Sequence, residues 1–503
     1  MTVRVNSTRG NCRTPATLSA VAGLSLLFLQ SCAVNPVSGR PELTLISVEQ
    51  EQKIGAEEAK KVETEMGFAD DSTFTPYLDT LGQRLAENSP RKDVAYQFHI
   101  VDMAEPNAFA LPGGYIYVSR GLLALSNSEG ELAGVVGHEI GHVAGRHTVQ
   151  RISKQGPLAV VFGLVSGITG LVSPLVGNII GGVGELTQSA IFAPYSRGQE
   201  TEADVVGQDI AARAGWDPGE LSTFLNSLER EVELHQKEPR KPSFFDSHPP
   251  TPDRVANTAA HAKTLTRASR EPISPSREAY LARLDGVVVG PRAADGIFKG
   301  HAFLHPDLNF FVEFPDKWPH ENSPRKIVAV SPDGDAAIIV GTAAKGDDPL
   351  DGARAAEKAA QVDLVSKTKT ISINGLPAAR AELKTDAKTH LEITWIAHGG
   401  VIYQVVGLAP AKRYQTLQPV FQAVAGSFRP LSASERANVT EKRVRLAKAR
   451  AGETIEDLTS RTHSAWRKEE VAVANGLTLS DRLREGQVLK VAMAERYEAR
   501  NRR

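Results

Sequence analysis

The stretch Gly137-His138-Glu139-Ile140-Gly141-His142 decides how the rest of this 503-residue chain is interpreted. Its two histidines are four residues apart, and residues i and i+4 of an α-helix lie above one another on one face. His138 and His142 can therefore bind one metal ion from a single rigid element. Glu139 is turned about 100° away from His138, so its carboxylate can reach a water on the metal without binding the metal itself.

The residues around this stretch favour a helix. Ser128 and Glu131 form the S-x-x-E pattern of a capping box. Apolar residues follow at helical spacing, at Leu132, Val135, Val136, Ile140 and Val143. H-E-x-x-H on a helix is typical of zinc metalloproteases, in which the glutamate is the general base. A buried helix with two incidental histidines would contain the same pattern. A third ligand is therefore needed to distinguish a metal site from such a helix.

Two positions compete to supply that ligand. Metzincins continue the motif as H-E-x-x-H-x-x-G-x-x-H. Here Gly145 is in place but His147 comes one residue early, so we reject this spacing. The alternative is a second helix that begins within residues 195–204 and runs to about Ala214, where Gly215 ends it.

Glu200 and Asp204 share one face of that second helix, because they too are four residues apart. Glu200 could complete the metal site, and Asp204 could accept a hydrogen bond from a ligand imidazole. A solvated acidic helix start would also suit the helix dipole, and Glu202 fits that interpretation best.

Four runs of sequence resemble the gluzincin zinc metallopeptidases that include the CAAX-prenyl protease, HtpX and BepA-like periplasmic lipoproteins. Their order and separations are similar to the family across roughly residues 45–265. The runs are 107–114 (NAFALPGG), the HExxH helix through His147, Glu200-x-x-x-Asp204, and Ser247-His248-Pro249-Pro250 with Arg254 six residues after the histidine.

The resemblance implies a zinc endopeptidase that takes protein or peptide substrates and holds one Zn²⁺ per chain. It implies that the zinc ligands are His138, His142 and Glu200 and that Glu139 is the base. It implies further that Asp204, His248 and Arg254 support the ligands or the transition state.

His248 has three possible roles within this resemblance. The prolines after it forbid a helix and present the imidazole from a stiff turn. The imidazole could donate to the oxyanion, or it could occupy the open zinc position and hold the enzyme at rest. The third possibility is a purely structural His-Pro turn.

A strand is expected directly after the Gly113-Gly114 turn, because residues 115–118 (YIYV) are β-prone. In zincins a strand of this kind runs along the cleft and binds an extended peptide as an additional strand. The substrate-binding residues would then be Gly114, Tyr115, Ile116 and Tyr117. An ordinary core strand is the other interpretation, and both can hold.

The first 31 residues have the features of a secretory signal, with a basic start and a short apolar core at 20–29. Leu29-Gln30-Ser31-Cys32 resembles a bacterial lipobox, which implies that Cys32 is acylated. Ala33 follows, where lipoproteins kept at the inner membrane usually carry aspartate. We therefore expect a periplasmic protein, anchored to the outer membrane by lipid on Cys32. Cys12 is the only other cysteine, so a metal site has to use His and Glu.

Residues 155–184 carry no charged side chain and are long enough to span a bilayer. Their glycines and two prolines would break a lipid-facing helix. We favour a buried or membrane-touching segment beside the cleft over a transmembrane helix.

The second half of the chain has the pattern of an antiparallel sheet. Residues 391–397 and 401–406 flank His398-Gly399-Gly400, which is a hairpin signal, and helical stretches are expected at 351–362 and 411–425. This region resembles PsbP-like or Mog1-like domains, and we assign it no chemistry.

Near the C-terminus, residues 450–458 (RAGETIEDL), 475–477 (NGL) and 483–491 (LREGQVLKV) resemble a LysM module. That resemblance implies a βααβ fold that binds N-acetylglucosamine polymers, and hence peptidoglycan. The stretch around Trp466 is longer than in that family, so a LysM-like fold without glycan binding is the alternative.

We therefore expect an α+β multidomain protein of about three domains. A mainly helical zincin peptidase domain with a small sheet comes first, then a small α+β domain with an antiparallel sheet, then the βααβ LysM-like module. The expected boundaries are a signal at 1–31, a tether at 32–48, the peptidase domain at 49–269, a linker at 270–296, the α+β domain at 297–430, the LysM-like module at 442–492 and a basic tail at 493–503.

Two classes of function remain. The first is a zinc endopeptidase for misfolded or unassembled envelope proteins, in protein quality control at the outer membrane. The second is a chaperone-like assembly factor for outer-membrane proteins whose zinc site is held mostly closed. The intact Glu139 favours the first, and a formal net charge of −1 argues against nucleic acid as a partner.

Overall fold

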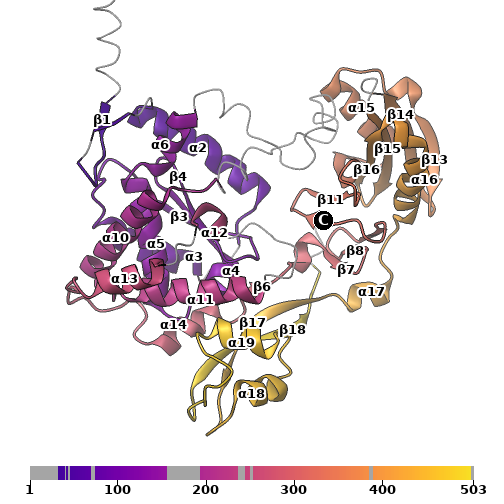
Figure 1. Ribbon diagram of the computed structural model, residues 1–503. Coiled ribbons are helices and arrows are strands. Elements are labelled where there is room, and N and C mark those ends of the chain that lie inside the picture. Colours follow the sequence, from indigo (N-terminus) through magenta and orange to yellow (C-terminus); the bar gives the residue numbers. More distant parts are fainter. Residues whose placement is uncertain are drawn as a thin grey trace, which may run out of the picture.

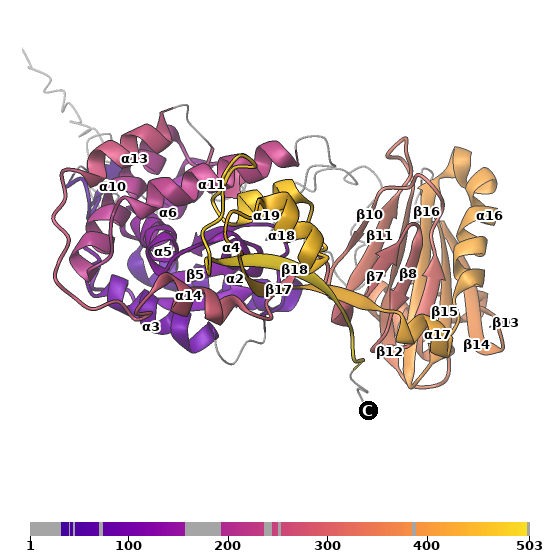
Figure 2. The ribbon, with the colours of Figure 1, turned by 90° about the horizontal axis from the view of Figure 1, so that it is seen from below.

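The computed structural model describes residues 32–39, 41–43, 46–69, 74–155, 193–235, 244–249, 253–384 and 389–499. The expected signal at 1–31 and almost all of the uncharged segment at 155–184 lie outside the described residues. A helical body built around a small sheet and a second body built on a large sheet make up the molecule, and the C-terminal elements lie against the helical body (Figures 1 and 2). Within the described ranges, no helix has the length and apolar character needed to cross a membrane.

The segment expected to be a tether begins with a short hairpin. β1 (Cys32–Val34) pairs antiparallel with β2 (Pro41–Leu43). In the turn between them, Asn35 Oδ1 accepts hydrogen bonds from the backbone N of Val37 at 2.7 Å and of Ser38 at 3.0 Å, as in an Asx turn. Cys32 therefore stands at the edge of a folded element.

The small sheet of the helical body corrects the expectation for residues 114–117. β5 (Tyr115–Ser119) lies between β3 (Gln97–Val101), to which it is parallel, and β4 (Ala108–Leu111), to which it is antiparallel. Since β5 is paired on both sides and Gly114 O accepts from Gln97 N, Gly114, Tyr115, Ile116 and Tyr117 cannot take a substrate as an additional strand. The substrate-strand prediction is wrong for this strand, because the hairpin places β4 at the edge.

Helices cover both faces of this sheet. α2 (Val48–Glu65) packs on one face through a cluster that includes Val62, Phe109 and Tyr117. The opposite face packs in the main core of the body together with α3 (Phe74–Ala86) and the HExxH helix α5 (Glu129–Ala144). The other helices here are α4 (Arg120–Leu125), α6 (His147–Gln155), α10 (Arg197–Ala214), α11 (Glu220–Leu234), α12 (Phe244–Ser247) and α13 (Arg254–Ala262).

Glycines bring α10 unusually close to α5. A Cβ built on Gly137 would lie 2.8 Å from Gly207 O, and one built on Gly207 would lie 2.6 Å from His138 N. Both distances are too short for real side chains, so only glycine fits where these two backbones cross. Every residue of α5 is buried. The close approach places the first turns of α10 beside the two histidines of α5.

The N-terminus of α5 is fixed by the buried carboxylate of Glu129. It accepts hydrogen bonds from Tyr77 OH at 2.8 Å, Trp216 Nε1 at 2.7 Å and Ile273 N at 2.8 Å, and from Ser274 N. These donors come from α3, from the residue pair that follows α10, and from the segment after α13. A carboxylate in the first turn also suits the positive end of the helix dipole.

The second body is built on a seven-stranded antiparallel sheet with the order β10-β11-β12-β16-β15-β14-β13. α16 (Ala411–Ser427) packs on one face and α15 (Leu350–Ala360) on the other. The predicted hairpin is present, because Gly399 and Gly400 have φ of 61° and 77° between β15 and β16. The strands are β10 (His320–Asn322), β11 (Lys326–Val330), β12 (Ala337–Lys345), β13 (Lys369–Ile373), β14 (Leu376–Lys384), β15 (Thr389–His398) and β16 (Val401–Pro410), and a separate small sheet holds β7 (Ile297–Lys299), β8 (Ala302–His305) and β9 (Phe310–Glu313).

The segment expected to be a linker, 270–296, is folded. It contains α14 (Arg277–Leu284) and β6 (Val288–Val289). Two of its arginines contact the helical body, because Arg292 pairs with Asp102 and the Arg283 guanidinium lies 4.3 Å from the ring centre of Tyr77.

β6 joins the C-terminal module to the helical body. It pairs with β17 (Thr440–Lys448), which pairs in turn with β18 (Val488–Arg496). α18 (Ile455–Thr462) and α19 (Lys468–Ala474) lie between β17 and β18 in the chain, so the element order of this module is βααβ. In Figure 2 the module, in yellow, lies against the helical body.

Replacing Glu129 by Ala is expected to lower the free energy of unfolding by roughly 3–5 kcal/mol, because its four donors would be buried without an acceptor. Urea denaturation of the purified protein measures this loss. Glu87→Ala is the matched control, since that side chain is 64% exposed. Equal stability of the two variants would contradict the role given to Glu129.

Candidate metal centre

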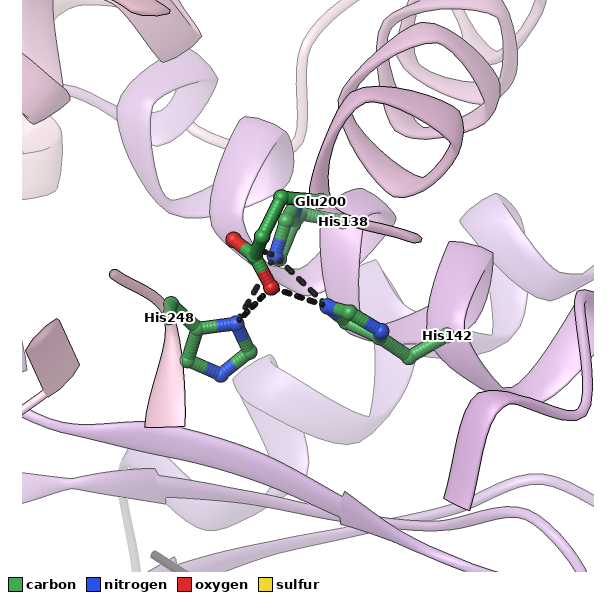
Figure 3. Close-up of side chains that lie close together, drawn as sticks. All are labelled: His138, His142, Glu200 and His248. Atoms are coloured by element: carbon green, nitrogen blue, oxygen red, sulfur yellow. Dashed lines mark hydrogen bonds and ion pairs between the residues drawn. The ribbon is translucent and has the colours of Figure 1, made fainter. Parts of the chain in front are cut away.

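Three elements bring together four side chains that could hold a metal ion (Figure 3). His138 and His142 come from α5, Glu200 from the first turn of α10, and His248 from the residue after α12. The two Nε2 atoms are 3.0 Å apart, and His142 Nε2 lies 3.3 Å from Glu200 Oε1. All four side chains are buried, and their ligand atoms lie within 4.8 Å of one another.

The spacing of these atoms suits a zinc ion. Ligands at about 2.0–2.1 Å from a tetrahedral zinc are separated from one another by about 3.3 Å. The observed separations are 3.0 and 3.3 Å, with 3.8 Å between His138 Nε2 and Glu200 Oε2. His248 Nδ1 lies 3.0 Å from Glu200 Oε1 and 3.2 Å from His138 Nε2. Three imidazoles and one carboxylate are a donor set that zinc favours.

Asp204 fixes the orientation of the first ligand ring. Its Oδ1 lies 2.8 Å from His138 Nδ1. A carboxylate at that distance holds the ring proton on Nδ1, which leaves the lone pair of Nε2 directed at the cluster. Burial disfavours a charged imidazole, but the hydrogen bond and charge of Asp204 outweigh it and raise the pKa of His138.

A second relay, which the sequence analysis did not find, orients His142. His142 Nδ1 lies 2.8 Å from His147 Nδ1, and His147 Nε2 lies 2.9 Å from Glu202 Oε2. When His147 Nε2–H donates a hydrogen bond to Glu202, His147 Nδ1 accepts one from His142 Nδ1–H, and the lone pair of His142 Nε2 is left free for a metal. His147, whose spacing excluded it as a metzincin ligand, thus supports the same centre from the far side of the His142 ring. Glu202 is not the solvated residue that we expected, because it bonds to buried His147.

Arg254 pairs with both carboxylates of α10. Its Nη1 lies 2.7 Å from Glu200 Oε2, and its Nη2 and Nε each lie 2.8 Å from an oxygen of Asp204. Burial alone would favour the neutral acids. The charges and hydrogen bonds of the surrounding histidines and of Arg254 prevail, and they hold the pKa of Glu200 well below its usual range and lower that of Asp204.

Glu139 stands apart from this bonded network. Its side chain is fully buried, and neither carboxylate oxygen has a hydrogen-bond partner among the described residues. The nearest charged neighbour is His248 Nε2, 3.5 Å from Glu139 Oε1. Burial raises the pKa of Glu139. A buried carboxylate without a partner is costly and needs an explanation, which a reaction at this site would supply.

Aromatic rings hold two of the imidazoles in place. Tyr195 stacks on His142 with ring centres 3.9 Å apart, and its OH bonds to Thr148 at 2.9 Å. Phe244 stacks on His248 at 4.1 Å. Tyr195 N also donates to Ser247 O at 2.9 Å, which ties the His248 turn to the start of α10. The sequence contained no signal for Tyr195, because nothing local reveals a stacking partner.

The structure thus brings together seven of the predicted site residues, while the predicted substrate strand lies within the sheet. The seven are His138, Glu139, His142, Glu200, Asp204, His248 and Arg254.

Comparisons with known proteins agree with this geometry. The family described as Peptidase family M48 matches residues 73–262. The beta-barrel assembly-enhancing protease of Escherichia coli K12 is 28% identical over 261 residues, which cover 51% of this chain and 52% of that protein. This chain therefore spans about half the length of that curated relative.

Two further relatives are metalloproteases by name. The mitochondrial metalloendopeptidase OMA1 of Schizosaccharomyces pombe is 25% identical over 47% of this chain and 68% of that protein. Among solved structures, a cyanobacterial PsbP from Synechocystis aligns with 28% of this chain and 98% of its own, at 14% identity and a TM-score of 0.22. Metalloprotease YcaL of Escherichia coli K12 is 31% identical over 186 residues, which cover 37% of this chain and 68% of that protein. The chain therefore belongs to peptidase family M48, whose members are zinc-dependent.

Proposed function

We propose that this protein is a zinc-dependent endopeptidase that cleaves misfolded or unassembled proteins of the cell envelope. The observation that carries the proposal is the buried set of His138, His142 and Glu200 at tetrahedral spacing. Beside it lies the carboxylate of Glu139, which accepts no hydrogen bond from the described residues. Family membership supports the reaction class. The name of the Escherichia coli relative, a beta-barrel assembly-enhancing protease, supports the envelope as the place of action.

The roles proposed for the chain's own residues follow from their positions. His138, His142 and Glu200 would hold the zinc, which when bound supplies a Lewis acid for the peptide carbonyl and acidifies a water. Glu139 would take one proton from the attacking water while the oxygen of that water bonds to the carbonyl carbon. Glu139 would then return that proton to the leaving nitrogen as the C–N bond breaks. Arg254 would keep Glu200 ionised, and Asp204 would keep the neutral His138 ring aligned with Nε2 toward the metal.

The substrate backbone is proposed to bind at β4 rather than at β5. Among the described strands β4 pairs with β5 alone, so its other edge could take an additional strand. Because Ala108–Leu111 are buried, that edge would have to be uncovered first. β4 also packs against α5. The His248 turn reaches the start of this edge, since Phe244 N donates to Pro106 O at 3.1 Å.

His248 is proposed to close the resting site. Its Nδ1 lies 3.0 Å from Glu200 Oε1 and 3.2 Å from His138 Nε2, which suits a fourth ligand and not a donor standing away from the metal. These distances favour the lock over the oxyanion donor and the structural turn. A substrate would have to displace the imidazole before water could enter.

The same closure favours a second candidate function, a chaperone-like assembly factor for outer-membrane proteins. Glu139, His142 and His248 are all buried, so a molecule held in this state would not cleave. The presence of Glu139 still supports a peptidase that opens.

Location and surface partners are proposed from the sequence features. Lipid on Cys32 would hold the protein on the periplasmic face of the outer membrane. Because one acyl chain gives only marginal binding, the several chains of a lipoprotein would be needed. The βααβ order of the C-terminal module supports a LysM-like fold, and peptidoglycan binding rests on that likeness alone.

Glu139→Gln should abolish cleavage of casein, with a loss of at least about 100-fold in turnover, because the amide cannot accept the proton. Zinc content should stay at one ion per chain. Removing zinc with a chelator should abolish wild-type activity, and adding zinc should restore it. Glu456→Gln is the control, since its side chain is 68% exposed. Full activity of Glu139→Gln would refute the mechanism.

His248→Ala should increase turnover of casein and produce self-cleavage, because the metal would gain an open position. Initial rates and gel analysis during storage measure both effects. A loss of about 100-fold would indicate an oxyanion donor instead. Normal kinetics with normal zinc affinity would remove His248 from the site.

Cys32→Ser should release the protein into the soluble periplasmic fraction, because the acceptor of the lipid is lost. Fractionation followed by immunoblotting measures the distribution. A Cys32→Ser protein that still sediments with outer membranes would contradict the anchor.

A further inference from the structure

A lysine of the C-terminal module is completely buried against the helical body. Lys490, on β18, has no exposed surface. Its Nζ donates to three backbone carbonyls, those of Ala124 at 2.8 Å, Leu125 at 3.0 Å and Ser126 at 2.6 Å. These residues are the end of α4 and the residue that follows it, more than 360 positions earlier in the chain.

The Lys490 ammonium supplies hydrogen-bond donors to the carbonyls at the C-terminal end of α4. The last carbonyls of a helix have no partner within the helix, and they carry the negative end of its dipole. A lysine ammonium has three donors and no acceptor, so three carbonyls satisfy it fully. Burial lowers the pKa of Lys490, while the nearby carboxylate of Glu131 opposes that effect.

The C-terminal module positions the Lys490 side chain by fixing the backbone of that residue. Lys490 N donates to Asn475 Oδ1 at 2.8 Å, and Asn475 Nδ2 donates to Lys490 O at 2.8 Å. The same Nδ2 bonds to Val471 O on α19 at 2.8 Å. The backbone of Lys490 is therefore fixed relative to α19, and its side chain extends from there into the helical body.

The carbonyls that Lys490 binds belong to the turn from which the HExxH helix starts. Residues 126–128 connect α4 to α5. In that turn Glu131 Oε2 accepts from Asn127 N at 2.7 Å, and Ser128 Oγ accepts from Glu131 N at 3.0 Å. Ser126 Oγ bonds to Tyr280 OH at 2.5 Å. His138 lies nine residues beyond Glu129, about 14 Å along a rigid helix, so a tilt at this turn would move the ligand imidazoles.

Further contacts keep the module in place beside this turn. Arg277 Nη1, on α14, donates to Val488 O at 3.0 Å, and Arg230, on α11, bonds to Leu477 O. β6 adds a strand to the sheet of the module. Loss of the ammonium alone would therefore leave the module docked.

We propose that the C-terminal module, residues 440–496, is a positioning element of the peptidase and that Lys490 sets the start of the zinc helix. The kinetic part of this proposal, measured as kcat and KM, rests on the proposed peptidase function. Its other two readouts, zinc affinity and local amide protection, do not depend on cleavage.

The test compares Lys490→Met, which keeps the apolar stem without the ammonium, with Lys490→Arg and with a control, Lys468→Met. Lys468 lies on α19 in the same module, and its side chain is 39% exposed. The full-length proteins are compared for zinc affinity by competition with a chromophoric chelator. Amide hydrogen exchange is followed at 120–131 and, as a reference, in β15 and β16. kcat and KM are measured on casein.

Lys490→Met should bind zinc about tenfold more weakly and lose a similar factor in kcat, with KM nearly unchanged, as expected when ligands are misplaced from a distance. Amide protection should fall at 120–131 and stay unchanged in β15 and β16. Lys490→Arg should recover part of the zinc affinity, and Lys468→Met should match the wild type.

Normal zinc affinity in Lys490→Met would overturn the proposal. So would a loss of protection spread evenly over the chain, because that is the mark of a purely structural residue. If Lys490→Met does not fold, Asn475→Ala keeps the ammonium and loosens its backbone. That variant should show a smaller loss of zinc affinity, and a normal value would overturn the proposal. If the wild type binds zinc without cleaving casein and Lys490→Met binds zinc weakly, the peptidase proposal fails while this one stands.

Discussion

The packing of two helices at backbone contact is the constraint on which the site depends. Gly137 and Gly207 let α5 and α10 approach until a Cβ on either one would overlap the other backbone. Side chains of ordinary size would hold the helices at 8–10 Å between axes. At that separation the short carboxylates of Glu200 and Asp204 would no longer reach the imidazoles of α5. The ligand distance of 3.3 Å between His142 and Glu200 thus depends on residues that carry no chemistry of their own.

Close packing also concentrates charge in a place without water. Glu200, Asp204 and Glu139 lie together with almost no exposed surface, and isolated buried carboxylates are strongly unfavourable. Arg254 offsets two of them with three short contacts. Glu139 is left without a hydrogen bond from the described residues. The network therefore stabilises the charged forms of the proposed ligand Glu200 and of Asp204, which orients His138, and it leaves the proposed base Glu139 without such a partner.

Local patterns in the sequence correctly predicted the features that depend on a single helix or a single turn. The i, i+4 spacing placed His138 with His142 and Glu200 with Asp204, and the capping signals located both helices. Two glycines correctly marked the hairpin between β15 and β16. What failed depended on pairing between distant segments. The strand after Gly114 was expected to bind a peptide as an additional strand, yet β3 and β4 flank β5 on both sides. The role of His147 depends on Glu202, 55 residues away, and no periodicity reveals a partner at that distance.

Glu129 at the N-terminus of the HExxH helix and Arg91 at its C-terminus carry the signs that the helix dipole favours. At its N-terminus Glu129 gathers donors from three segments, and Lys490 fixes the preceding turn. At its C-terminus Arg91 reaches Val143 O, and Glu51 binds both Arg91 and Arg146. A helix that carries two ligands and a base must hold them within a fraction of an ångström. Burial alone would leave such a helix free to slide along its axis, because apolar contacts are not directional. Hydrogen bonds to buried charges are directional and restrict such sliding, and in our proposal Lys490 of the C-terminal module adds to them at the turn before the helix.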